Sequence, residues 1–323
     1  EQAFLIGHQL LHGRIKASDA AAAWTERADT CVTLMARAAE TETVRRFGPA
    51  PGTWSIIGLG KLGGREMTAG SDLDLIVIYD ADGASDAQNW FTRFTQRLIT
   101  ALSAETGEGR LYETDMRLRP SGRSGPVATS LAAFERYHQS NAWTWEHMAL
   151  TRARVLTGPM EVKEELDAII ASVLNAPRNA DKLRQEVLKM RSEMAAHKPA
   201  QGELDAKLSR GGLVDLEFLV HYLQLRERTA FDPDLRKALL RLAEQGFVPD
   251  TLIEAHDMMT RLLVSARLLA PGLSKPAPSA ASALAEACKC QDYTDLTRTF
   301  QSARHSVAQS WKEIFDMDLE TAE

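Results

Sequence analysis

An acidic pair stands directly before a strongly apolar run. Asp72 and Asp74 flank Leu73, and residues 75–79 read Leu-Ile-Val-Ile-Tyr, which is typical of a buried β-strand. Side chains two residues apart on a strand point to the same face, so both carboxylates share one face and Leu73 points to the other. Two like charges held this close repel each other unless a cation lies between them. Magnesium, which binds a few carboxylates together with substrate phosphates, suits this position.

A second charged cluster follows later in the chain. Residues 111–118 form a further predicted strand, which Pro120 ends. On such a strand Asp115, Arg117 and Arg119 share one face. They add a third carboxylate and two guanidiniums, whose planar forks suit bidentate binding of phosphate.

A glycine-rich turn precedes the acidic pair and follows the first predicted strand, residues 54–58. It reads Gly60-Lys61-Leu62-Gly63-Gly64 and leads toward a short helix. Exposed backbone N–H groups in such a turn, together with a lysine, can hold a triphosphate. Taken alone, the Asp-x-Asp pair is better explained by a capped turn, and the later cluster by a surface ion-pair ladder. The combination of all three features favours metal-assisted displacement at phosphorus.

The same turn also matches a dinucleotide-binding fingerprint. Residues 58–63 fit G-x-G-x-x-G, and Asp80 ends the next strand. A Rossmann unit, however, needs a full helix between its strands, and residues 64–71 are too few and contain Gly70. Its second strand is also buried on both faces, whereas this strand opens with two aspartates. These features disfavour binding of a dinucleotide.

The elements around these residues are mostly helical. Residues 1–46 are alanine-rich and predict helix, and residues 86–104 predict another helix with one aromatic face. From about residue 130 the chain is predicted to be helical throughout. Asp232 and Pro233 are expected to begin one helix of this part. The sequence therefore predicts an α+β protein in which a small, mostly antiparallel or mixed sheet precedes an all-α helical bundle.

Composition limits the class of protein. The chain has 323 residues, of which 44% are hydrophobic and 25% charged, so it is globular rather than disordered. A net charge of −6 disfavours general nucleic-acid binding, and no apolar run is long enough to span a membrane. Three cysteines without a Cys-x-x-C pair favour a reducing cytoplasm. Because Glu1 falls within a helical pattern, we expect the chain to be a piece of a longer protein.

Longer motifs carry a family resemblance. Residues 58–75 read Gly-Leu-Gly-Lys-Leu-Gly-Gly-Arg-Glu-Met-Thr-Ala-Gly-Ser-Asp-Leu-Asp-Leu and resemble the signature of the DNA polymerase beta nucleotidyltransferase superfamily. Together with residues 115–122 and 211–218, they resemble the bacterial glutamine synthetase adenylyltransferase family. That family has two similar halves, of which one adds AMP to a tyrosine of glutamine synthetase and the other removes it by phosphorolysis. Val214 and Asp215 favour the adenylylating, C-terminal half.

The resemblance implies a fold, a reaction and partners. It implies a polymerase-beta-like nucleotidyltransferase domain with N-terminal helices over residues 1–158, and a helical bundle domain over residues 159–323. ATP is the implied substrate, two Mg²⁺ ions the implied cofactor, glutamine synthetase the implied partner, and the PII signal protein a further candidate. Neither nucleic acid nor a membrane is an expected partner, and the cytoplasm is the expected location.

The same resemblance assigns roles to individual residues. The implied catalytic and metal-binding residues are Asp72, Asp74 and Asp115. The implied nucleotide-binding residues are Gly60, Lys61, Gly63, Gly64, Ser71, Arg117 and Arg119.

Three other functions remain open at this point. The first is the deadenylylating half, which would consume phosphate and release ADP. The second is a uridylyltransferase for PII, which would be expected to carry a histidine- and aspartate-rich hydrolase domain as well. The third is a non-catalytic module that senses glutamine or binds PII, although such a sensor has no use for three carboxylates beside a phosphate-binding turn.

Two further clusters have plain structural alternatives. Trp143 and Trp145, followed by Arg152 and Arg154, could line a groove for nucleotide or protein, but a helix that packs its tryptophans into the core explains them equally well. Asp215, Glu217 and His221 could suggest a metal site, but charges in the first turn of a helix explain them better.

Overall fold

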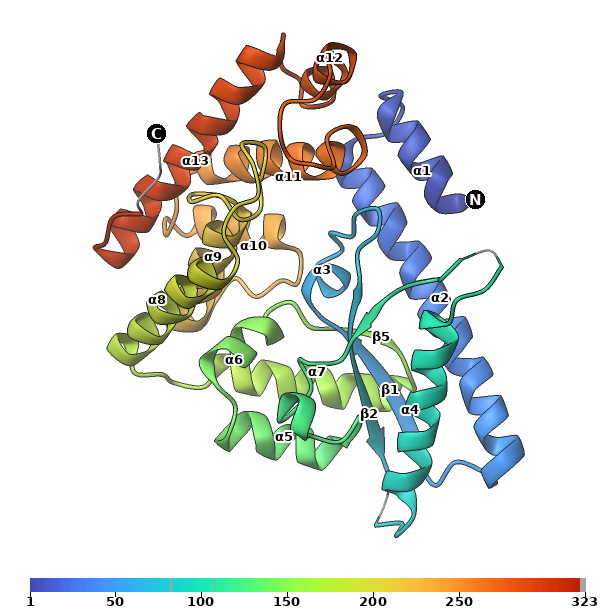
Figure 1. Ribbon diagram of the computed structural model, residues 1–323. Helices are drawn as coiled ribbons and strands as arrows, with labels where there is room; N and C mark the ends of the chain where they lie inside the picture. Colours follow the sequence, from blue (N-terminus) through green and yellow to red (C-terminus); the bar gives the residue numbers. More distant parts are fainter. Residues whose placement is uncertain (82, 108, 320–323) are drawn as a thin grey trace. The chain divides into compact units, whose positions relative to one another are not determined.

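The computed structural model describes residues 1–81, 83–107 and 109–319 (Figure 1). Its contacts divide the chain into two compact units. One unit is Thr25–Ala176, and the other joins Glu1–Trp24 to Pro177–Glu323. All described strands belong to the first unit, and the second is helical, so the predicted α+β class with a small mixed sheet is confirmed. The predicted domain boundary after residue 158 stays a prediction.

The sheet of the first unit is mixed. Its strands are β1 (Thr53–Gly58), β2 (Leu73–Asp80), β3 (Thr114–Asp115), β4 (Ala128–Ser130) and β5 (Arg154–Thr157). Their order is β3-β2-β1-β5, and β4 also pairs with β2. β1 is antiparallel to β2 and β5, whereas β3 and β4 run parallel to β2. Because the strands of a Rossmann unit are parallel, the antiparallel β1–β2 pair agrees with the prediction against dinucleotide binding.

Helices cover the sheet because their apolar faces match its buried strands. On α4 (Ala87–Ser103), Phe91 stacks on Tyr79 of β2 with ring centroids 4.5 Å apart, and Phe94 lies 4.9 Å from the ring of Trp54. The predicted aromatic face of residues 86–104 is thereby confirmed. The other helices of this unit are most of α2 (Ala17–Phe47), the one-turn α3 (Gly60–Gly63), α5 (Leu131–Ser140), α6 (Thr144–Leu150) and α7 (Met160–Asn175).

The predicted strand over residues 111–118 is wrong in its length. Only Thr114 and Asp115 pair with β2, and the chain then turns. The backbone N–H of Arg117 donates to Oδ1 of Asp115 at 2.8 Å. A local bond of an aspartate to the backbone two residues on competes with continued strand pairing, which explains why β3 is short.

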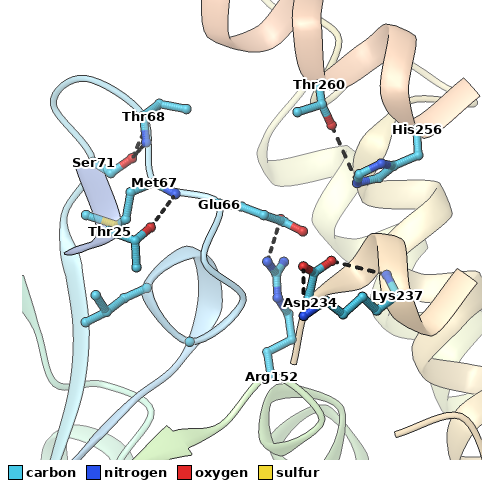
Figure 2. Close-up of polar contacts among 12 residues, drawn as sticks. Thr25, Glu66, Met67, Thr68, Ser71, Arg152, Asp234, Lys237, His256 and Thr260 are labelled. Carbon is cyan, nitrogen blue, oxygen red and sulfur yellow. Dashed lines mark hydrogen bonds and ion pairs between the residues drawn. The ribbon is translucent and has the colours of Figure 1, made fainter. Parts of the chain in front are cut away.

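Two other local predictions are wrong. The expectation of an all-helical chain after about residue 130 misses β5, which is too short to show a period in the sequence and exists through its pairing with β1. The helix α10 (Leu235–Glu244) is capped by Asp234 rather than by Asp232 and Pro233. The side chain of Asp234 accepts from the N–H of Lys237 at 3.1 Å (Figure 2).

The second unit buries its apolar stripes in a helical core. Its helices are α1 (Gln2–Leu11), α8 (Ala180–His197), α9 (Leu213–Glu227), α10, α11 (Thr251–Leu269), α12 (Pro278–Ala287) and α13 (Tyr293–Phe315). The long stripe predicted near the end of the chain is confirmed on α13, where Leu296, Phe300, Val307 and Trp311 are buried. Among the helices of the described residues, none combines the length and the apolar character needed to cross a bilayer.

Candidate active site

The glycine turn lies directly against one of the predicted catalytic carboxylates. Gly60 begins α3 with φ +51°, a left-handed conformation that favours glycine. A Cβ atom at this position would collide with Oδ2 of Asp74. The backbone N–H of Leu59 also donates to the carbonyl of Asp74 at 3.0 Å. Glycine at position 60 therefore lets the turn approach the carboxylate of Asp74 closely.

The sheet register brings two of the three predicted carboxylates together. In the parallel pairing of β2 and β3, Asp74 lies opposite Asp115. Residues paired in this way point to the same face of the sheet. Both aspartates are half-buried, Asp72 is exposed, and Leu73 and Leu75 are buried. The predicted alternation of carboxylates and core residues around Leu73 is confirmed.

Arg117 places a positive charge beside these carboxylates. In addition to its backbone bond, its Nε donates to Oδ2 of Asp115 at 2.7 Å. The hydrogen bond from the guanidinium is the main reason why the pKa of Asp115 lies below its usual range. In return, the hydrogen bond with Asp115 raises the pKa of Arg117, and the negative charges of Asp74 and Asp72 raise it further. All three predicted carboxylates therefore act on one cation.

The carboxylate oxygens of this cluster are of the kind that binds Mg²⁺, but in this structure Arg117 occupies the oxygens of Asp115. Carboxylate oxygens are ligands that Mg²⁺ takes, and the three carboxylates already attract the guanidinium of Arg117. Both oxygens of Asp115 are bonded to Arg117, however. Within the described ranges, no group of three or more His, Cys, Asp or Glu is arranged to hold a metal ion. The roles of Asp72, Asp74 and Asp115 as magnesium ligands stay predictions.

Arg119 does not share the face of Asp115 and Arg117, because the chain turns after β3. Its side chain is buried, and its guanidinium donates to the carbonyls of Met116 at 2.7 Å and Gly125 at 3.3 Å. Burial lowers the pKa of Arg119. The expectation of one shared face is wrong, and Arg119 holds the loop that follows β3.

Ser71 closes the segment between the glycine turn and β2. Its Oγ accepts from the N–H of Thr68 at 3.0 Å and lies 2.8 Å from Oγ1 of Thr68 (Figure 2). The N–H of Met67, in the same segment, donates to Oγ1 of Thr25 at 3.4 Å. These bonds fix the chain just before Asp72. Nucleotide binding by Ser71, like that by Lys61, stays a prediction.

Arg152 and Arg154, which the sequence offered only as candidates for lining a groove, hold the glycine turn. Arg154 donates to the carbonyls of Leu62 at 2.9 Å and Gly63 at 3.2 Å. Arg152 forms an ion pair with Glu66 at 2.5 Å (Figure 2). The Arg-x-Arg spacing was visible in the sequence, but only the pairing of β5 with β1 places Arg154 at this turn, with Arg152 two residues before the strand.

The alternatives for the remaining clusters are settled in part. Trp143 is 69% exposed and Trp145 40% exposed, so the interpretation that they pack into the core is wrong. Asp215 is fully buried in the first turn of α9, where it pairs with Arg191 of α8 and accepts from the N–H of Gly211 at 2.7 Å. This agrees with a structural role at the start of the helix.

Comparison with known proteins gives two family matches. Residues 1–169 match the family model of glutamate-ammonia ligase adenylyltransferase. Residues 180–315 match the model of the GlnD PII-uridylyltransferase. The gap between the two matches includes Ala176, where the strand-containing unit ends.

The curated relatives have one common description. The chain is 43% identical, over 92% of its length, to the bifunctional glutamine synthetase adenylyltransferase/adenylyl-removing enzyme of Agrobacterium fabrum. It is 38% identical, over 100% of its length, to the enzyme of the same name from Xanthobacter autotrophicus. The chain spans about a third of the length of these relatives, with 32% and 34% of them covered.

Proposed function

This chain belongs to the glutamate-ammonia ligase adenylyltransferase family, and we propose on that basis that it transfers AMP from ATP to a tyrosine hydroxyl of glutamine synthetase and releases pyrophosphate. The observation that carries the proposal is the contact of the glycine turn with Asp74, whose register partner is Asp115. A phosphate-binding turn beside paired carboxylates is the arrangement that metal-dependent nucleotidyl transfer requires.

The proposed reaction joins the phenol oxygen of the tyrosine to the α-phosphorus of ATP. The bond between the α-phosphorus and the pyrophosphate oxygen breaks, and the phenol proton leaves to Asp115 or to water. Asp115 is suited to orient the phenol, because its half-buried carboxylate lies opposite Asp74 in the register of β2 and β3. Bound Mg²⁺ would supply charge stabilisation at the phosphates and would lower the pKa of the phenol.

Different residues of the chain would bind the metal ions and the triphosphate. Asp72, Asp74 and Asp115 would hold the magnesium ions. Lys61 and Arg117 would bind the triphosphate, together with the backbone of the glycine turn, where charge develops as pyrophosphate leaves. Arg117 now bonds to Asp115, and we propose that binding of nucleotide and metal replaces this ion pair by a contact of Arg117 with phosphate.

A second candidate is the deadenylylating activity, since the relatives' name covers both reactions. Val214 and Asp215 within residues 211–218 support the adenylylating half. The match of residues 180–315 to a PII-uridylyltransferase model supports the PII signal protein as a further proposed partner. Glutamine synthetase remains the proposed acceptor, and the cytoplasm the proposed location.

The test is to incubate the chain with unmodified glutamine synthetase, ATP and Mg²⁺ and to measure the intact mass of the synthetase subunit. A gain of one AMP per subunit supports the proposal. Loss of AMP from a previously modified sample, dependent on phosphate, supports the second candidate instead. A synthetase whose mass changes in neither reaction contradicts both.

A further inference from the structure

The glycine turn is a helix that cannot be stable by itself. α3 has four residues, and one helical turn costs more backbone entropy than its few hydrogen bonds return. At its C-terminal end the backbone bond to the carbonyl of Leu62, which comes from the N–H of Arg65, is long at 3.4 Å. An element this short keeps its shape only where neighbouring groups hold it.

The guanidinium of Arg154 is one group that holds α3 in this way. Its Nη2 donates to the carbonyl of Leu62 at 2.9 Å, and its Nε donates to the carbonyl of Gly63 at 3.2 Å. Both carbonyls belong to the last residues of α3, where a positive charge interacts favourably with the helix dipole. The guanidinium thus caps the end of α3 that lies opposite Gly60 along the helix.

Asp29 of α2 fixes the direction of this guanidinium. Its two carboxylate oxygens accept from Nη1 and Nη2 of Arg154, each at 2.9 Å. The side chains are 18% and 23% exposed, so the pair is largely shielded from water. The single ammonium nitrogen of a lysine could not span all four of these acceptor atoms, whereas the planar fork of arginine bonds to them together.

Arg152 holds the same turn by close packing. A Cβ atom on Gly63 would collide with the carbonyl oxygen of Arg152, and one on Gly64 would collide with its guanidinium. That guanidinium is buried and pairs with Glu66, just after the turn. The two glycines are therefore required by the approach of Arg152, whatever further contact they make with nucleotide.

We propose that Arg154, oriented by Asp29, is a positioning residue for the phosphate-binding turn. It holds α3 so that Gly60 stays against Asp74 and the N–H groups of the first turn face the triphosphate. Arg152 supports the same turn through Gly63 and Gly64. This inference rests on the proposed function, because it assumes that the turn binds the triphosphate of ATP.

The test compares ATP binding with stability in variants of the whole chain. Arg154→Lys keeps the charge and removes the fork, so we expect the dissociation constant of Mg-ATP to rise roughly tenfold, as for the loss of about 1.4 kcal/mol. The KM for ATP should rise with it, while kcat at saturating ATP and the melting temperature stay close to wild type. Asp29→Asn should weaken ATP binding in the same direction, and the double variant should be less than additive.

A matched control is Arg241→Lys. Arg241 also pairs with an aspartate, Asp232 at 2.9 Å, and donates to a backbone carbonyl, that of Phe231 at 2.7 Å, but it lies in the helical unit. It should leave the affinity for ATP unchanged. Unchanged ATP affinity in Arg154→Lys, or a loss of kcat that follows a lower melting temperature at constant KM, would overturn the inference.

Binding and transfer separate this inference from the proposed function. If the wild-type chain binds ATP in an Arg154-dependent manner but modifies no glutamine synthetase, the proposed function is wrong and the role of Arg154 is supported. If AMP transfer occurs and Arg154→Lys binds ATP normally, the role of Arg154 is contradicted and the proposed function is supported. A wild-type chain that binds no ATP overturns both.

Discussion

Asp74 and Asp115 lie opposite each other in the parallel register of β2 and β3. β3 has only two residues, yet this short pairing is enough to place the third carboxylate beside the acidic pair. The glycine turn reaches the same point from β1, because Gly60 packs against the carboxylate of Asp74. The candidate site thus depends on three segments that meet at Asp74.

Asp74→Asn tests the central carboxylate. The amide has nearly the same shape but lacks the charge needed to hold a divalent cation, so AMP transfer should fall on the order of 10²-fold or more. Transfer of label from α-labelled ATP to glutamine synthetase measures this loss, and circular dichroism checks the fold. Asp80→Asn, at the exposed opposite end of β2, is the matched control and should retain normal transfer. Normal transfer by Asp74→Asn would remove this residue from the mechanism.

Gly60→Ala tests the close approach of the turn to Asp74. The added Cβ would meet Oδ2 of Asp74 at a positive φ, so both stability and ATP binding should decrease. Gly70→Ala is the control, because Gly70 also has a positive φ, +76°, but its Cβ would meet no atom within 4 Å. It should lose only about 1 kcal/mol of unfolding free energy through backbone strain. Equal effects of the two variants on ATP affinity would contradict the contact.

Much of this site could be predicted from the sequence, because its signals are local. The alternation around Leu73 fixed which side chains face the core, and the glycine-rich sequence from Gly60 to Gly64 marked a turn that leads into a short helix. The antiparallel β1–β2 pair agrees with the rejection of a Rossmann unit, which rested on the shortness of residues 64–71. Each of these inferences depended on a few neighbouring residues.

The remainder depended on contacts between distant segments. Arg154 and Asp29 are far apart in the sequence, and the residues around each of them do not indicate that the two side chains pair. Arg119 was expected on the face of Asp115 because the strand was predicted to continue past Asp115. The bond from the N–H of Arg117 to Asp115, which ends β3, leaves no periodic pattern in the sequence that could have predicted it. β5 was missed for a similar reason, since four residues are too few to show alternation and only pairing with β1 makes them a strand.

Arg117→Gln tests the cation that closes the cluster. Loss of the guanidinium removes the main cause of the lowered pKa of Asp115 and also frees its Oδ2, while the backbone N–H of residue 117 still bonds to Oδ1. Mn²⁺, used as a probe for Mg²⁺, should therefore bind more tightly in the absence of nucleotide. Because Arg117 is 61% exposed, we expect a gain on the order of threefold. ATP binding should weaken in the same variant, since the proposed phosphate contact is lost.

Electron paramagnetic resonance of Mn²⁺ measures the first effect. Arg110→Gln is the control, because Arg110 is also an exposed arginine paired with carboxylates, those of Glu105 and Glu113. It should change neither Mn²⁺ nor ATP binding. Weaker Mn²⁺ binding in Arg117→Gln would mean that Arg117 supports the metal site rather than competing with it.

The lowered pKa of His138 predicts how the free energy of unfolding depends on pH. Its side chain is buried on α5, and burial, helped by the nearby charge of His147, lowers its pKa from 6.5 to about 3. Between these values the unfolded chain binds a proton that the folded chain excludes, so this group makes stability rise with pH across that window. At pH 4.5 the loss relative to neutral pH should be about 2–3 kcal/mol from this residue. His138→Gln cannot take up the proton, so its denaturant-derived unfolding free energy should fall less between pH 7 and pH 4.5 than that of the wild type. Exposed His305→Gln should keep the wild-type loss, and an unchanged acid dependence in His138→Gln would show that other groups cause it.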